Sequence, residues 1–454
     1  MKPNLLIIPA AIRSHVLPSL YLADALADEY EVVYAVPNEI LAEMVVANGY
    51  RAVPHSGMLV GYQMEAPFVA SQKQKPTYWR LFKAYRRNEL YHARQRELNA
   101  LIDELRPAAV LIDLFACTDF WVLYPRRAAF KLLFFNPMPS TYRVKGFPIV
   151  SDKSPLPAAA DRPEGGMKNK VETVPRLLDW LRHPKNTLMA WAMRRQREAL
   201  EQIAPLAPDA TVTQVIANVP ELLLAPLEFE FAPEVCKPNQ HYLGLCQRDN
   251  RKDTELDAGF EEKWKVIMAQ KQRGEQIVYC SFGTFHEGAD AALLRFVTNL
   301  LEVLRELPHV QLVCATNKHL IETLRHRGLL TAHTHFFTRV PQMQVLAHTD
   351  VFVTHAGFGS IKEAIYYAVP MLAYPLDPHY DQNGNALKLE HHGLGLRGAF
   401  AHERPNDLKT KLLRLLAEDA FREKVRRFRD AIGHNTPEIL HSLLSTPSYE
   451  TERC

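Results

Sequence analysis

The stretch 336–393 constrains the fold more than any other part of this 454-residue chain. An apolar run at 350–354 ends in His355, the small-residue segment Ala-Gly-Phe-Gly-Ser follows, and a helix-like run occupies 361–367. A strand, a glycine-rich turn and a helix in this order form a phosphate site. Glycine lets the backbone come close, and a helix N-terminus offers free N–H groups and a positive dipole end. We therefore expect this stretch to hold a nucleotide diphosphate.

Strand-like and helix-like segments alternate along most of the chain. Apolar runs typical of buried parallel strands lie at 5–8, 31–36, 108–112, 130–135, 221–225, 241–245, 276–280, 310–315, 335–338 and 371–374. Helix-like patterns lie at 19–29, 40–48, 73–107, 177–203, 293–306, 319–327, 405–429 and 437–444, and a Pro- and Gly-rich surface loop is expected at 151–175. The alternation predicts an α/β protein, and the length predicts two domains.

Composition excludes several classes of protein. A hydrophobic content of 47% and a charged content of 23% are typical of a soluble globular protein, and a net charge of +3 is too small to indicate nucleic-acid binding. Six scattered cysteines without a Cys-x-x-Cys pair suggest neither a disulfide framework nor a zinc ribbon. The N-terminus does not resemble a signal peptide, and no apolar run reaches the length of a transmembrane helix. We expect a cytoplasmic protein.

The glycine-rich turn has two compatible interpretations. The dinucleotide fingerprint G-x-G-x-x-G fails because its third glycine position is Lys362, and the Walker A pattern fails as well. Ser360 and Glu363 also fit a capping box, S-x-x-E, at the start of a helix. A helix cap and a phosphate site use the same helix end, so spacing alone does not separate them.

Two weaker patterns accompany the turn. Asp381 and Gln382 come after the strand at 371–374, where a carboxylate and an amide suit sugar hydroxyls, although a solvated turn would look the same. Ser281 and Thr284 lie in the turn Ser-Phe-Gly-Thr after the strand at 276–280 and could face a phosphate. Neither pattern is specific by itself.

Two residues of the first half suggest proton transfer. His15 and Asp113 each stand just beyond a predicted parallel strand, and ligands of open α/β sheets bind at that edge. A carboxylate that holds an imidazole makes a general base. Asp119 is a rival partner for the histidine, and a lone histidine after a strand is more often a simple loop residue.

Histidine pairs and a basic helix leave two further possibilities. The pairs His333/His335 and His391/His392 lack a third ligand at a recognisable spacing, so we expect no metal site. The segment 73–97 interleaves Lys and Arg with Tyr, Trp and Phe. An ordinary solvated helix explains this pattern, and a weak contact with a membrane surface is the alternative.

Taken in order, the motifs of 339–386 resemble the signature of family 1 glycosyltransferases, the UDP-dependent enzymes of plants, animals and bacteria. The matching residues are Pro341-Gln342, Val345-Leu346, His348, Thr354-His355, Gly357, Ser360, Glu363, Val369-Pro370, Pro375, Asp381-Gln382 and Asn385-Ala386. The turn at 281–284 is similar to the family's S-F-G-[ST], and the segment 15–18 is similar to its N-terminal H-x-x-P. The resemblance covers about a sixth of the chain with strong motifs, in both predicted domains.

This resemblance implies the GT-B fold, in which two Rossmann-like domains face each other across a cleft. We place the acceptor domain at 1–240 and the donor domain at 241–434, with a C-terminal helix within about 435–454 packing back on the first domain. The implied catalytic base is His15, held by Asp113. The implied donor-binding residues are Ser281, Thr284, Arg339, Val340, Gln342, His355, Gly357, Gly359, Ser360, Glu363, Asp381 and Gln382.

Within that set, the resemblance implies individual roles. Positions toward the diphosphate are Ser281, Thr284, His355 and Ser360; positions toward the ribose are Gln342 and Glu363; positions toward the donor sugar are Asp381 and Gln382. The chain also departs from the signature. Arg339 replaces the Trp that stacks on the base, Gly359 replaces an Asn, Ala368 replaces a Gly, and the loop 376–380 is about two residues longer. A planar guanidinium can also stack on a base.

The function implied is inverting transfer of a sugar, with glucose expected, from a UDP-sugar to a hydroxyl of a small lipophilic acceptor. No metal and no separate cofactor are implied. A dTDP-sugar donor, a sugar-nucleotide epimerase on the same fold, and a non-catalytic nucleotide-sugar binding protein are the alternatives. The sequence does not name the acceptor or the oligomeric state.

Overall fold

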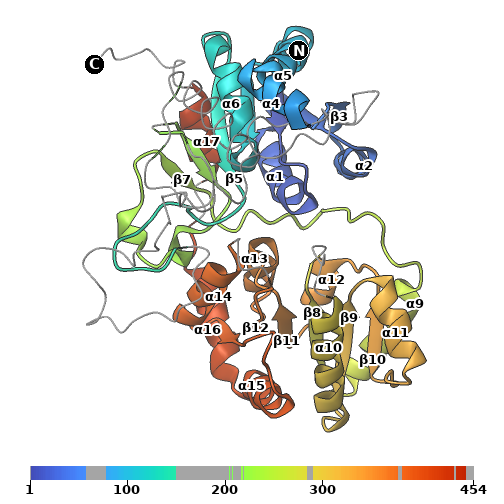
Figure 1. Cartoon of the computed structure of the whole chain (residues 1–454). Coiled ribbons are helices and arrows are strands. Elements are labelled where there is room, and N and C mark those ends of the chain that lie inside the picture. Colours follow the sequence, from blue (N-terminus) through green and yellow to red (C-terminus); the bar gives the residue numbers. More distant parts are fainter. Residues whose placement is uncertain are drawn as a thin grey trace, which may run out of the picture.

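The computed structural model describes residues 2–57, 78–149, 219–283, 290–376, 381–433 and 436–445, with isolated positions between 204 and 217. The predicted loop at 151–175, the predicted helix at 177–203 and Thr284 lie outside the described residues. Two bodies face each other, the first above the second in Figure 1.

The first body is built on a seven-stranded parallel sheet in the order β3-β2-β1-β4-β5-β6-β7. Its strands are β1 (Asn4–Ile8), β2 (Glu31–Val36), β3 (Arg51–Pro54), β4 (Ala109–Asp113), β5 (Lys131–Asn136), β6 (Glu221–Leu223) and β7 (Gln240–Tyr242). Its helices include α1 (Arg13–Leu26), α2 (Glu39–Ala47), α4 (Tyr78–Arg86), α5 (Glu89–Leu105) and α6 (Cys117–Leu123). The central strands are buried throughout, as their continuous apolar runs predict.

The second body is built on a six-stranded parallel sheet in the order β10-β9-β8-β11-β12-β13. Its strands are β8 (Gln276–Ser281), β9 (Val310–Ala315), β10 (Thr334–Phe337), β11 (Val351–Thr354), β12 (Met371–Ala373) and β13 (Gly395–Arg397). Its helices include α9 (Phe260–Gln272), α10 (Asp290–Arg305), α11 (Lys318–His326), α12 (Gln342–Leu346), α13 (Phe358–Tyr366), α14 (Gln382–His391), α15 (Pro405–Ala417) and α16 (Asp419–Asp430). The predicted α/β architecture with two parallel sheets is confirmed.

The last described helix, α17 (Thr436–Ser445), returns to the first body (Figure 1). Leu440 lies in the same apolar cluster as Leu5 and Val16, and Thr436 donates a 2.8 Å hydrogen bond to the Leu243 carbonyl. The C-terminal helix therefore crosses back to the first domain, as expected. The first sheet ends at Tyr242, and the domain limits that we place at 240 and 434 remain predictions.

Two predicted helices need correction. The helix expected at 19–29 starts earlier, because α1 begins at Arg13 and contains Pro18. Pro18 lies beyond the first turn of α1, and its missing N–H removes the intrahelical bond to the Ser14 carbonyl. The single helix expected at 405–429 is two helices, because Glu418 takes an extended conformation between α15 and α16.

Candidate active site

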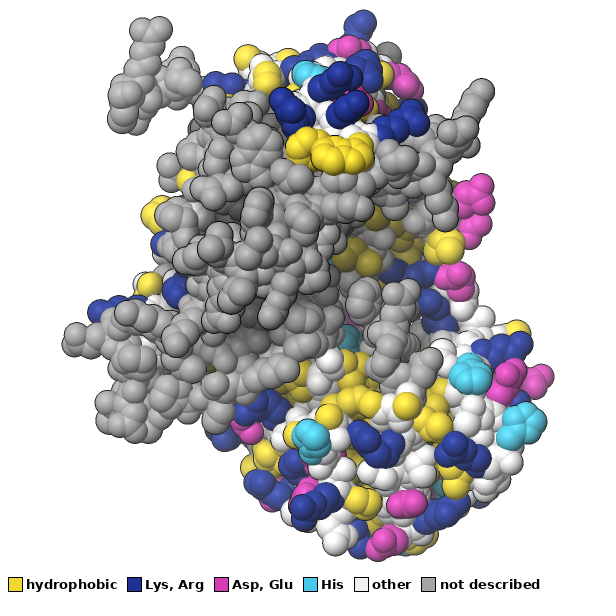
Figure 2. Space-filling model, viewed as in Figure 1, with side chains coloured by type: hydrophobic (Ala, Val, Ile, Leu, Met, Phe, Trp, Pro, Cys, Tyr) yellow, Lys and Arg dark blue, Asp and Glu magenta, His cyan; other side chains and the backbone are white. Residues whose placement is uncertain are grey.

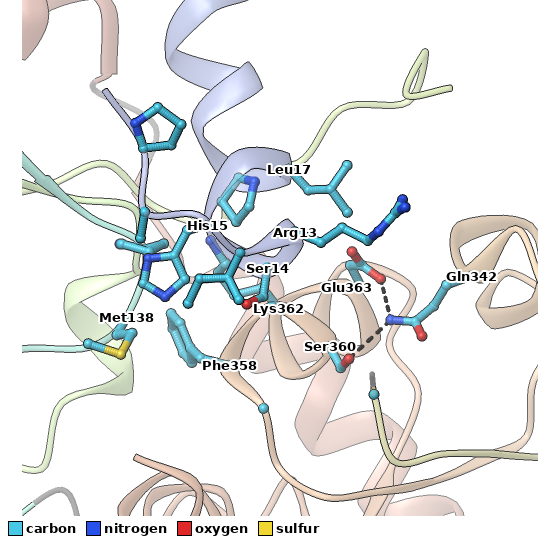
Figure 3. Close-up of a pocket in the computed structure, with 18 of the residues that line it drawn as sticks. Arg13, Ser14, His15, Leu17, Met138, Gln342, Phe358, Ser360, Lys362 and Glu363 are labelled. Carbon is cyan, nitrogen blue, oxygen red and sulfur yellow. Dashed lines mark hydrogen bonds between the residues drawn. The ribbon is translucent and has the colours of Figure 1, made fainter. Parts of the chain in front are cut away.

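A cleft of about 820 Å³ lies between the two bodies. The first body contributes the segment 8–18, Phe115 and Met138, and the second contributes residues of α12, α13 and the turns beside them. Figure 3 shows His15 of α1 facing Phe358 of α13, with Met138 beside them. Both groups of residues predicted from the sequence therefore border one cavity.

The predicted pair of His15 and Asp113 is formed. β1 and β4 are neighbouring parallel strands with Ile8 opposite Ile112, so the residues just beyond them meet at one sheet edge. His15, in the first turn of α1, lies with Nδ1 2.8 Å from Asp113 Oδ2. The other oxygen of Asp113 accepts a 2.8 Å hydrogen bond from the Phe115 N–H. A carboxylate only accepts, so the neutral ring carries its proton on Nδ1 and leaves Nε2 as a base.

Asp119, the rival partner, does not bind His15. Its two oxygens accept hydrogen bonds from Arg94 Nε at 2.8 Å and Arg94 Nη2 at 2.6 Å, and both side chains are fully buried. Position explains why Asp113 and not Asp119 binds the histidine. Asp119 lies in α6 and faces α5, whereas Asp113 ends a strand. His15 is also a helical residue and not the loop residue of the alternative interpretation.

His355 is enclosed by two glycine turns. A Cβ on Gly357 would lie 2.4 Å from His355 Nε2, and a Cβ on Gly283 would lie 2.9 Å from its Cε1. Gly283 also has a positive φ of 72°. Any side chain at these two positions would displace the ring, so both turns need glycine to hold it. Residues 281–283 and the turn at 355–360 are thus parts of one site.

The N-terminus of α13 is open toward the cleft. Its N-cap is Gly357, which provides no side-chain cap, so the first amides of the helix lack a side-chain acceptor. Gly359 lines the cleft, and a Cβ there would meet nothing within 4 Å. Free amides and open space at a helix N-terminus suit an anion.

The capping box that Ser360 and Glu363 suggest is not formed, because both residues lie inside α13. Both bind Gln342 of α12 instead. Its Nε2 donates to Ser360 Oγ at 3.1 Å and to Glu363 Oε2 at 2.6 Å, as the dashed lines of Figure 3 mark. Its Oε1 accepts a 3.0 Å hydrogen bond from Tyr279. The signature residues of α12 and α13 are therefore one connected polar network.

Asp381 and Gln382 stand at the start of α14 and line the same cleft. Asn385 Nδ2 donates to Asp381 Oδ2 at 2.8 Å and to the Ala356 carbonyl at 3.0 Å, which ties the start of α14 to the His355 turn. Burial raises the pKa of the Asp381 carboxyl above its usual range. The spacing Asp-Gln-x-x-Asn thus has a structural reason.

The remaining predicted positions are at the same side of the cleft. Ser281 ends β8 and is buried, and Val340 is buried beside Arg339. The Arg339 side chain is 30% exposed, with Nη2 4.0 Å from Glu255 Oε2. The described part of the structure thus brings all predicted donor positions except Thr284 to one region.

Sequence reasoning missed several cations of the cleft, and three of them lie close to the predicted positions. Arg13 of α1 forms an ion pair with Glu255, Arg251 forms one with Glu363, and the buried Lys362 donates to the Leu224 carbonyl. Arg13 and Arg251 stand in segments without a motif, and nothing in the sequence indicates that they border a ligand site. Lys362 is adjacent to Glu363 in the signature, yet only its burial between the two bodies distinguishes it.

Among the described residues, no three His, Cys, Asp or Glu side chains gather as a metal ion would require. The same part of the chain contains no helix with the length and apolar character needed to cross a bilayer.

The chain is similar to known glycosyltransferases. A family model described as UDP-glucoronosyl and UDP-glucosyl transferase matches residues 175–438. The Caenorhabditis elegans protein ugt-47, named as a UDP-glucuronosyltransferase, is 25% identical over 228 residues, 48% of this chain and 40% of that protein. Human UDP-glucuronosyltransferase 2B7 is 32% identical over 110 residues, 24% of this chain and 20% of that protein. The chain thus spans less than half the length of these curated relatives.

The fold has a full-length counterpart. A crystal structure of the glycotransferase of kitacinnamycin matches with a TM-score of 0.65 and 20% identity, covering 98% of this chain and 100% of that one. At this identity the likeness concerns the fold, and it confirms the GT-B arrangement. Because the family model covers more than half of the chain, this protein belongs to the UDP-glucosyl and UDP-glucuronosyl transferase family, as its motifs suggest.

Proposed function

We propose that this protein is an inverting glycosyltransferase that moves a sugar, glucose being the first to test, from UDP to a hydroxyl of a small lipophilic acceptor. One observation supports this most directly. His15 of the first body, held by the buried Asp113, borders the same cleft as the His355 turn with the open N-terminus of α13. A base on one side and an anion site on the other are the two parts that sugar transfer to a hydroxyl requires.

In the proposed reaction, His15 Nε2 accepts the proton of the acceptor hydroxyl while its oxygen attacks the anomeric carbon. The bond between that carbon and the diphosphate oxygen breaks on the opposite face, so the configuration inverts. The bonding electrons leave with UDP. Asp113 holds the ring through Nδ1 and stabilises the imidazolium that forms.

The leaving diphosphate would be stabilised by the amides at the start of α13 and by His355. Ser281 and Thr284 are proposed to add hydroxyls on the same side. These groups supply the charge stabilisation, so the proposal does not require a metal ion. Unaltered turnover in excess chelator is expected, and a loss restored by Mg²⁺ would contradict it.

The remaining donor contacts are assigned by the match of these residues to the family signature. We propose Gln342 and Glu363 for the ribose, Asp381 and Gln382 for the sugar, and Arg339 and Val340 for the base. The Arg339 guanidinium in place of an indole can stack on either pyrimidine. Donor assays should therefore compare UDP-glucose with dTDP-glucose.

The acceptor side of the cleft is mostly apolar. Beside His15 it is lined by Ile8, Ala10, Phe115, Pro137 and Met138. Among the described residues, apolar side chains thus adjoin the proposed base, and apolar walls with a few polar groups suit a lipophilic molecule that carries a reacting hydroxyl. This supports a lipophilic acceptor and leaves its identity to experiment.

One assay tests the proposed function. The protein is incubated with UDP-glucose and a panel of phenols, sterols, carotenoids and macrolides, and UDP release and glycosylated product are measured. Transfer to any of them supports the proposal. A new sugar isomer formed without acceptor would indicate an epimerase, and donor binding without turnover on any acceptor would indicate a binding protein.

We also propose a cytoplasmic protein with weak peripheral membrane contact through α4. Trp79 is 56% exposed there, and Arg80, Lys83 and Arg86 share the helix. Figure 2 shows Lys and Arg beside hydrophobic side chains at the top of the first body, where Figure 1 places α4 and α5. Cosedimentation with anionic but not neutral vesicles, weakened by Trp79→Ala, is the expected result, and equal sedimentation with both would contradict it.

A further inference from the structure

The segment 247–257, which we call the strap, joins the two bodies along the cleft and is held by both (Figure 1). On the first body, Asn48 Nδ2 donates to the Lys252 carbonyl at 3.0 Å, and its Oδ1 accepts from the Lys252 N–H at 3.0 Å. On the second body, the Thr338 N–H donates to Asp257 Oδ2 at 3.0 Å. These bonds fix the backbone of the strap on either side of the cleft.

Next to this anchor, Arg251 faces the second body. Its Nη1 donates to Glu363 Oε1 at 2.5 Å, and its Nε lies 3.0 Å from Asp253 Oδ1. The Arg251 and Glu363 side chains are 8% and 9% exposed. Burial lowers the pKa of the guanidinium, but the two carboxylates outweigh burial and the net pKa is raised. Arg251 therefore stays charged beside Glu363.

The carboxylate of Glu363 is held at both oxygens. Arg251 occupies one site on Oε1, and Gln342 Nε2 occupies one site on Oε2 at 2.6 Å. A carboxylate has about two acceptor sites on each oxygen, so one site remains on each. Two adjacent acceptor sites match the two O–H groups of a vicinal diol. The 2′ and 3′ hydroxyls of a ribonucleotide are such a diol, whereas a 2′-deoxyribonucleotide has only one of them.

We propose that Arg251 is a positioning residue for the donor, and that it acts by holding the Glu363 carboxylate toward a ribose diol. The inference rests on the proposed function. It assigns part of the donor site to the strap, which the first body holds through Asn48. It also makes Arg251 a determinant of preference for UDP over dTDP.

The test uses the full chain with UDP and dTDP as probes. The variants are Arg251→Gln, Arg251→Lys and Lys252→Gln. Lys252→Gln is the matched control, because that side chain is exposed on the same strap and only its backbone binds Asn48. Calorimetry gives Kd for each nucleotide, and kinetics give kcat and KM for UDP-glucose. Thermal unfolding shows whether each variant is folded.

We expect Arg251→Gln to weaken UDP binding about tenfold, since a hydrogen bond to a charged group is lost. The loss for dTDP is expected to be clearly smaller, so the preference for UDP falls. KM for UDP-glucose should rise while kcat at saturation stays within about twofold, because the reacting groups are untouched. Arg251→Lys should recover part of the affinity, and Lys252→Gln should bind as the unmodified protein does.

A double-mutant cycle with Glu363→Gln checks the route of the effect. If Arg251 acts through Glu363, adding Arg251→Gln to Glu363→Gln costs little further affinity. Additive losses, equal losses for both nucleotides, or a fall in kcat with KM unchanged would overturn the inference while leaving the proposed function standing. Failure of the unmodified protein to bind either nucleotide would overturn both.

Discussion

Two buried carboxylates of the first body, Asp113 and Asp119, have the same chemistry and different partners. Both side chains are fully buried. Asp113 ends β4 and binds the imidazole of His15, while Asp119 in α6 binds the guanidinium of Arg94 from α5. Burial of a carboxylate therefore does not by itself indicate a role in the proposed catalysis; the partner of the carboxylate separates the two cases.

The difference arises from how the two partners handle protons. An imidazole gains and loses a proton near neutral pH, so the His15 pair can move one. A guanidinium keeps its charge, so the Arg94 pair cannot. The second pair joins α5 to α6 and supports the wall of the cleft. The comparison predicts that changes at the first pair affect turnover and changes at the second affect stability.

The largest effect is expected at His15. His15→Ala removes the proposed base and should lower kcat about 10⁴-fold, at the upper end of general-base effects. UDP affinity should stay nearly unchanged, because the donor positions lie on the other body. Turnover by product formation and Kd for UDP check this, with His92→Ala on exposed α5 surface as the control. Full activity in the variant would contradict the assignment of His15 as the general base.

Arg94→Met is expected to lower stability and to leave turnover nearly unchanged, which is the reverse of the effect at His15. It leaves Asp119 buried without a partner, and loss of one member of a buried pair costs about 3–5 kcal/mol. Denaturant unfolding measures the loss, and kcat per folded molecule is expected to remain within about twofold. Arg96→Met, exposed on the same helix, is the control. A stable variant with impaired turnover would mean that this pair takes part in catalysis.

Asp113→Asn tests how much the Asp113 carboxylate contributes to the action of His15. The histidine remains, but its ring loses the carboxylate that orients it and stabilises its charged form. A fall in kcat of about 100-fold is expected, less than for removal of the base itself. Kd for UDP should stay nearly unchanged, because Asp113 lies on the first body. Turnover equal to that of the unmodified protein would argue against a role for Asp113 in holding the base.

Glu221 is a third buried carboxyl of the first body, and its hydrogen-bond partners are the side-chain amides of Gln240 and Asn136. Burial raises its pKa to about 7, against the effect of hydrogen bonds from Gln240 and Asn136. The folded state then holds the proton at a pH where the unfolded state has lost it, so stability falls as pH rises. From about pH 5.5 to about pH 7.5 the expected loss is about 2 kcal/mol. Unfolding of Glu221→Gln should lack this part of the slope; an identical slope would contradict the assignment.

The residues of the proposed donor side were the most predictable part of the candidate site. They stand just after strands in a fixed order, and the carboxyl ends of parallel strands bring such residues to one edge of the sheet. His15 and Asp113 were predicted for the same reason, since β1 and β4 are neighbours. Most central strands were also predicted, because buried parallel strands are continuous apolar runs.

Other features depend on contacts that the local sequence does not encode. The edge strand β3 is only partly buried, so it lacks an apolar run. Helix α14 contains Asn and Gly, which are poor helix formers, and it is fixed by the contacts of Asn385. Arg251 lies in a charged segment that looks like a solvated linker, and its role depends on the distant Asn48.

The return of α17 has a consequence for synthesis and folding. Tyr21 donates a 3.3 Å hydrogen bond to Thr436, and Leu440 is buried among side chains of β1, α1 and α2. A ribosome releases these first-body elements long before residues 436–445 exist, and it makes the whole second body in between. The apolar surface that α17 later covers is therefore exposed on the first body while the second body is made and folds. Because α17 contacts residues that are far away in the sequence, its packing onto the first body is expected to be a late and slow step of folding.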